Sequence, residues 1–114
     1  MSDCIFCLIA AKEIPADLVY EDDEVVAFRD LNPQAPVHLL VIPRKHLRGL
    51  DAAGPGDEAL LGRLALVAAQ LAAPEGLGDS GYRVVGNNGP DAGQAVDHVH
   101  YHVIGGRKMT WPPG

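Results

Sequence analysis

The sequence is poor in basic residues. Its 114 residues include nine Lys and Arg against 15 Asp and Glu, which gives a formal net charge of −6. Such a chain is unsuited to broad electrostatic contact with polymeric nucleic acid or an anionic membrane, although a local pocket can still hold a phosphate group. We therefore expect neither among its partners, and any nucleotide it recognises would be a small ligand.

Long apolar runs are also absent. The most apolar stretch, residues 61–73, contains Arg63 and Gln70 and is shorter than the roughly 18 to 20 residues that span a bilayer. The first residues lack the basic segment and apolar run of a secretory signal. We expect a cytoplasmic protein, and the length corresponds to a single domain over residues 1–114.

Cysteine is scarce, and the only two, Cys4 and Cys7, form a C-x2-C pair. A structural disulfide is disfavoured in the cytosol. The pair could bind a metal, act in redox chemistry or be two small buried side chains. Redox chemistry is the less favoured, because a redox C-x-x-C normally opens a helix after a strand and no strand precedes this one.

The hydrophobic pattern predicts an α+β fold with a mostly antiparallel sheet. Apolar residues recur at three- and four-residue spacing over residues 57–73, which predicts a long amphipathic helix packed on the sheet. A short helix is predicted in residues 4–14, with Ile5, Leu8 and Ile9 on one side. Strands are predicted within residues 18–30 (two strands around an acidic turn), 38–43, 81–87 and 98–105.

Three of the five histidines are crowded into one predicted strand as His98, His100 and His102. Alternate side chains share one face of a strand at intervals of roughly 7 Å, so the three would form a row of imidazoles. The row could simply be the solvent-exposed face of a half-buried strand. Histidine is a poor generic choice for that purpose, whereas a pKa of about 6.5 suits a nucleophile, an acid or a metal ligand. Two histidines could also complete a Cys2His2 zinc site.

The segment "DHVHYHVIGG" closely resembles the histidine-triad motif of the histidine triad (HIT) superfamily. The resemblance extends through "CIFCLIAAKEIPA", "FRDLNPQAPVHLLVIPRKH" and "GGRKMTWPPG". The last of these looks like the end of the Hint branch of purine nucleotide phosphoramidases. The resemblance implies a HIT-like fold, with a five-stranded, mostly antiparallel sheet, one long helix and one short helix, assembled as a homodimer.

The resemblance also implies separate catalytic roles for the histidines. His100 would attack the α-phosphorus of a nucleoside phosphoramidate, and water would then hydrolyse the nucleotidyl-histidine. His102 would hold a phosphate oxygen and help to protonate the leaving amine. His38, in "PVHLLV", matches a fourth active-site histidine that biases the protonation of the triad.

The ligand implied by the resemblance is a purine nucleoside monophosphate such as AMP or GMP, bound by His100, His102 and further residues. Asp30 would accept hydrogen bonds from both ribose hydroxyls, as a carboxylate can. Ala95 stands where many Hint members have a serine, so one hydroxyl contact with the phosphate is lost. The base slot would comprise Phe6, Ile9, Ile14, Phe28 and Leu31, the phosphate loop Asn87, Gly93, Gln94, Ala95 and Val96, and Trp111 would border the site of the partner subunit.

Members with an N-terminal C-x2-C bind zinc, and the matching ligands here are Cys4, Cys7, His46 and His98. Four protein ligands leave no open position, so this zinc would be structural. Two alternatives to an enzyme are a nucleotide-binding or protein-interaction module with incidental hydrolysis, and a small zinc protein without pocket chemistry.

Overall fold

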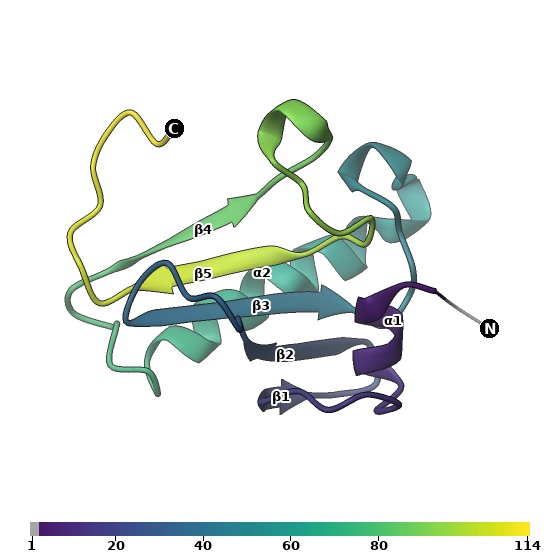
Figure 1. Cartoon of the computed structure of the whole chain (residues 1–114), viewed down its shortest axis with the longest axis horizontal. Helices are drawn as coiled ribbons and strands as arrows, with labels where there is room; N and C mark the ends of the chain where they lie inside the picture. The colour runs from purple at the N-terminus through teal and green to yellow at the C-terminus, as the bar shows by residue number, and fades with distance from the viewer. Residues whose placement is uncertain (1–2) are drawn as a thin grey trace.

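A computed structural model, which describes residues 3–114, shows one five-stranded antiparallel sheet with the long helix against one face and the short helix against the other (Figure 1). The strands lie in the order β1-β2-β3-β5-β4, and each neighbouring pair is antiparallel. This architecture confirms the predicted fold class. The elements are α1 (Ile5–Ala10), β1 (Leu18–Glu21), β2 (Val25–Arg29), β3 (Val37–Pro43), α2 (Glu58–Ala72), β4 (Tyr82–Gly86) and β5 (Tyr101–Gly105), with 3-10 turns η1 (Leu50–Ala52), η2 (Pro55–Asp57) and η3 (Pro90–Ala92).

Strand alternation divides the core into two layers. One face of the sheet packs against Leu64 and Val67 of α2, and the opposite face packs against α1. Because successive side chains of a strand point to opposite faces, neighbouring residues of β2 and β3 contribute to different layers. The strand residues facing α2 are Val25, Ala27, Leu39, Val41 and Val103, and those facing α1 are Val26, Phe28, Leu40 and Ile42.

The apolar side predicted for the short helix α1 is buried only in part. Phe6, Ile9 and Ala10 are buried, whereas Ile5 is 48% exposed. The ring of Phe6 packs edge-on against Phe28, with the centroids 5.5 Å apart. The helix also ends early, since Lys12 adopts a left-handed backbone with φ of 59°.

The strand predicted over residues 98–105 begins only at Tyr101, so the prediction was wrong for its first three residues. The backbone N–H of Val99 donates to the carbonyl of Leu47 at 2.7 Å, outside the sheet. The ring of His98 meanwhile bonds to the carbonyl of Pro43, at the end of β3. The alternation nevertheless holds, because Val99 and Val103 pack on the α2 side and the three histidines lie on the other.

The described helices are short, and the longest, α2, has 15 residues. Within residues 3–114, no helix combines the length and hydropathy needed to cross a bilayer.

The packing of α2 predicts a large effect of Leu64→Ala. Leu64 is fully buried, so truncation should lower the free energy of unfolding by about 2 to 5 kcal/mol through lost burial and the cavity left behind. Urea denaturation measures this loss. The matched control, Gln70→Ala, changes an exposed residue of the same helix and should stay within about 0.5 kcal/mol of the parent. Equal losses would contradict the assigned packing.

Candidate active site and metal cluster

An apolar cavity of about 280 Å³ opens between α1 and β2. All five residues predicted for the base slot line it: Phe6, Ile9, Ile14, Phe28 and Leu31. Asp30, Ala95 and Val96 border the same space. The structure adds Ile5, Pro15, Ala16, Asp17, Arg29 and Leu40 to the lining. Of these, Leu40 could have been found from the sequence, because it lies two residues after His38 on the same strand face.

His100 is held by a backbone carbonyl. Its Nδ1 lies 2.7 Å from the carbonyl oxygen of His98, and a carbonyl only accepts, so Nδ1 carries the proton. In the neutral imidazole, Nε2 then has a free lone pair. The ring is buried, with only 6% of the residue exposed, and the edge of Phe6 packs on it at a centroid distance of 5.1 Å. In its neutral form, His100 therefore presents Nε2 in a fixed position with its lone pair free.

A chain of hydrogen bonds also determines which ring nitrogen carries the proton in His38 and in His102. The backbone N–H of Gln34 donates to Nδ1 of His38 at 3.0 Å, so this nitrogen is unprotonated and the proton of His38 is on Nε2. That Nε2–H lies 2.8 Å from Nδ1 of His102 and donates to it. His102 in its neutral form must then carry its proton on Nε2. The contribution of Gln34 was not predicted from the sequence, because a backbone N–H has no residue-specific pattern.

Burial keeps His102 neutral. The pKa of His102 is lowered to about 4, first by burial and then by the neighbouring rings of His100 and His38. The carboxylate of Asp30 acts against this shift, and its Oδ2 lies 3.4 Å from Nε2 of His38. At neutral pH the imidazole of His102 is thus an uncharged hydrogen-bond donor.

The loop between β4 and β5 is braced by the side chain of Gln94. Its Oε1 accepts from the backbone N–H of Gly89 at 2.8 Å, and its Nε2 donates to the carbonyls of Arg48 and Val96. Gly93 adopts a φ of 79°, in the left-handed region that favours glycine. The side chain of Gln94 thus fixes the shape of the loop, and Ala95 and Val96 border the cavity. Asn87 directly follows β4 at the start of this loop.

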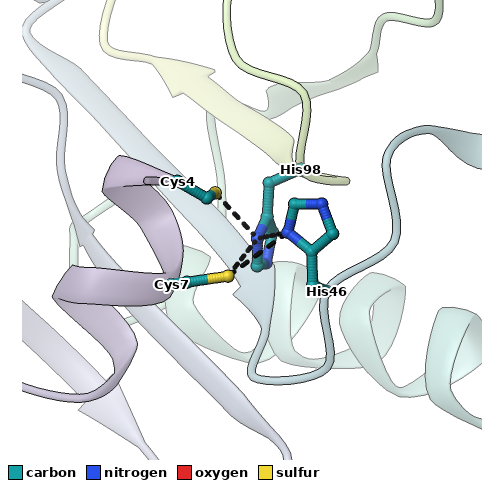
Figure 2. A group of neighbouring side chains, drawn as sticks. All are labelled: Cys4, Cys7, His46 and His98. Carbon is teal, nitrogen blue, oxygen red and sulfur yellow. Dashed lines mark hydrogen bonds between the residues drawn. The ribbon is translucent and has the colours of Figure 1, made fainter. Parts of the chain in front are cut away.

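Figure 2 shows Cys4, the N-cap residue of α1, and Cys7 within the helix pointing toward His46 and His98. The Sγ atom of Cys7 lies 3.2 Å from Nδ1 of His46 and 3.5 Å from Nδ1 of His98. The Sγ atom of Cys4 lies 3.4 Å from Nδ1 of His98, and the two Nδ1 atoms are 3.2 Å apart. A tetrahedral ion with Zn–S of about 2.3 Å and Zn–N of about 2.05 Å requires edges of roughly 3.3 to 3.8 Å. The four separations given, 3.2 to 3.5 Å, lie within about 0.1 Å of this range, so the cluster is compatible with a zinc ion.

A second set of contacts prepares His98 as a metal ligand. Its Nε2 donates to the carbonyl of Pro43 at 2.8 Å, so the lone pair of Nδ1 faces the cysteines. Backbone carbonyls commonly orient metal-binding histidines in this way. Burial lowers the pKa of His98, which favours the neutral, ligating form. Asp30, His38 and His102 form another group whose ligand atoms lie close together, and there Nε2 of His38 donates to Nδ1 of His102 at 2.8 Å.

Trp111 lies apart from this site within one chain. Its side chain is exposed, and the tail leaves the sheet after β5, at the opposite end of the structure from α1 (Figure 1). Arg83 of β4 donates to the carbonyl of Thr110 at 2.9 Å and anchors the tail. The role of Trp111 at a partner subunit therefore stays a prediction.

The fold and site define an α+β protein in which a histidine row adjoins an apolar cavity. The family model of the HIT domain matches residues 11–109, and the chain belongs to the HIT family. It is 56% identical over 112 residues to a HIT-like protein of Synechocystis, covering 98% of this chain and 97% of that protein.

Solved structures agree with this assignment. A HIT family hydrolase from Legionella pneumophila superposes with a TM-score of 0.96 at 50% identity, covering 98% of this chain and all of that one. A histidine triad nucleotide-binding protein from Candida albicans superposes with a TM-score of 0.82 at 33% identity, covering 96% of this chain and 83% of that one.

The lowered pKa of His102 predicts a pH dependence of stability. Between pH 6.5 and about 4 the unfolded chain binds a proton at this residue that the folded chain does not, so the free energy of unfolding falls as the pH is lowered through this window. The slope contributed by His102 is at most about 1.4 kcal/mol per pH unit. Urea denaturation from pH 7 to 4.5 should show a shallower slope for His102→Asn than for the parent. The control Gln70→Ala should keep the parent slope, and parallel curves for His102→Asn would refute the assignment.

Proposed function

We propose that the protein hydrolyses the P–N bond of purine nucleoside phosphoramidates through a covalent nucleotidyl-histidine. The observation that carries this proposal is the 2.7 Å hydrogen bond from Nδ1 of His100 to the carbonyl of His98. In the neutral imidazole this bond leaves the lone pair of Nε2 free as a nucleophile that needs no separate base. The membership of the HIT family and the likeness to a HIT family hydrolase support the reaction class.

In the first step Nε2 of His100 bonds to the α-phosphorus and the P–N bond breaks. His102 donates its Nε2–H to the phosphate or to the departing nitrogen, and this stabilises the charge that develops there. Solvent supplies the proton that the amine takes up. In the second step water attacks the phosphorus, restores neutral His100 and returns one proton to solvent. His38 positions His102 and fixes which nitrogen carries its proton.

The proposed substrates are amines linked to AMP or GMP. The apolar cavity supplies two faces for a purine, with Phe6, Ile9, Ile14, Phe28 and Leu31 in its lining. Asp30 at its border accepts from the ribose hydroxyls, and the loop from Asn87 through Gly93 and Gln94 to Val96 surrounds the phosphate. Ala95 provides no hydroxyl there.

The metal we assign is a structural zinc held by Cys4, Cys7, His46 and His98. The four ligand atoms lie close together, and a zinc ion with four protein ligands has no open position for chemistry, so its role would be to stabilise the fold. The protein would act as a cytoplasmic homodimer. The open edge of β4, where Tyr82 and Val84 are exposed, provides a surface for a second copy.

A nucleotide-binding module with incidental hydrolysis is the second candidate function. The relative from Candida albicans is described as a nucleotide-binding protein, and a site can bind a nucleotide well without stabilising a transition state. Measuring AMP affinity and phosphoramidate turnover on the same preparation separates the two candidates.

The enzymatic proposal predicts that His100→Ala lowers kcat on an adenosine phosphoramidate by at least about a thousandfold, as removal of a nucleophile does in other enzymes. AMP affinity should change little, since the cavity remains. Intact-protein mass spectrometry after rapid acid-free quenching should detect a nucleotidyl adduct on the parent and none on the variant. Parent-like turnover by His100→Ala would refute the role of this residue.

The zinc assignment predicts one zinc per chain, measured by metal analysis of the purified protein. Cys4→Ser removes a thiolate ligand and should lose most of the metal. Asp30→Asn alters the other group of close ligand atoms and should retain it. Full zinc content in Cys4→Ser, or loss confined to Asp30→Asn, would show that the ion lies elsewhere.

A further inference from the structure

The Cys/His cluster and the nucleophile share a residue. The ring of His98 lies in the cluster, while its backbone carbonyl holds Nδ1 of His100 at 2.7 Å. His98 is fully buried, and its other ring nitrogen is fixed on the carbonyl of Pro43. A side chain fixed at both nitrogens restrains its own backbone, so the cluster sets the direction of the carbonyl that orients His100.

Helix α1 forms a second connection, through Phe6. Residue 6 lies between the two cysteines, and its ring both lines the cavity and packs edge-on against His98 and His100, at centroid distances of 6.0 and 5.1 Å. Helix α1 has only six residues, and helices shorter than about 12 residues are marginal on their own. Its position therefore depends on what it packs against and on what its cysteines bind.

From these two connections we infer that Phe6 and His98 are positioning residues that couple occupancy of the Cys4/Cys7/His46/His98 cluster to nucleotide binding. A metal in the cluster holds α1 and the carbonyl of His98 in the geometry that binds a nucleotide, and a bound nucleotide holds the same geometry for the metal. This inference rests on the proposed function for its ligand. Coupling between two binding sites is reciprocal, so each ligand strengthens the other by the same factor.

The test measures the affinity of the zinc-loaded, full-length protein for zinc, by competition with a chromogenic chelator, with and without saturating AMP. The expected result is that AMP tightens zinc binding about tenfold, within the usual range of coupling between sites. Free AMP binds zinc weakly and would act in the opposite direction, so it cannot mimic this result. A purely structural zinc site would show no response to AMP.

Two matched variants of residues that line the cavity test whether the effect of AMP on zinc affinity depends on Phe6. Phe6→Leu keeps an apolar side chain but loses the ring edge against His98 and His100, and the effect of AMP on zinc affinity should fall below about threefold. Leu31→Ala changes a cavity residue that is 96% exposed. It should weaken AMP binding and yet retain the tenfold effect once AMP is saturating.

The outcomes separate this inference from the proposed function. If AMP binds but leaves zinc affinity unchanged in the parent, the coupling is refuted and the hydrolase proposal stands. If Phe6→Leu retains the full effect, or Leu31→Ala loses it equally, the assigned route through Phe6 is refuted. If AMP does not bind the loaded parent at all, the proposed function fails and the coupling fails with it.

Discussion

The hydrogen bond between Nδ1 of His100 and the carbonyl of His98 is the constraint around which the site is built. It fixes the proton of His100 on one nitrogen and leaves the other free. Residues 98–100, which carry this hydrogen bond, lie outside the sheet, because β5 begins only at Tyr101. The carbonyl of Leu47 accepts from the backbone N–H of Val99, and the carbonyl of Pro43 accepts from the ring of His98. These two bonds hold the segment in place.

The central pair of antiparallel strands, β3 and β5, supplies the rest of the geometry. His38 pairs in register with Ile104, and Leu40 pairs with His102, so both histidines lie on the face covered by α1. Their opposite-face neighbours, Leu39 and Val103, are fully buried under α2. The alternation of side chains thus places core residues on one face of the sheet and the histidines of the candidate site on the other.

The periodicity of the sequence was sufficient to predict the sheet, the long helix and the shared face of the three histidines. It failed where the decisive partner is a backbone group: the start of β5 depends on the carbonyl of Leu47, and the proton of His38 depends on the N–H of Gln34. Backbone donors and acceptors are the same at every residue, so no pattern reveals them. The grouping of His46 with the cysteines likewise came from family resemblance, because spacing alone is silent over 39 residues.

The charges in the site indicate which groups would bind the substrate in the proposed reaction and how readily the product would leave. Among the described residues that line the cavity, the only basic one is Arg29, which is paired with Glu75 at 2.8 Å. With a pKa near 4, His102 meets the phosphate as a neutral donor. In the proposed reaction the apolar slot would supply most of the binding free energy, and neutral N–H groups would orient the phosphate. A neutral donor holds a phosphate less tightly than a cation does, so His102 would let the nucleoside monophosphate leave readily after hydrolysis.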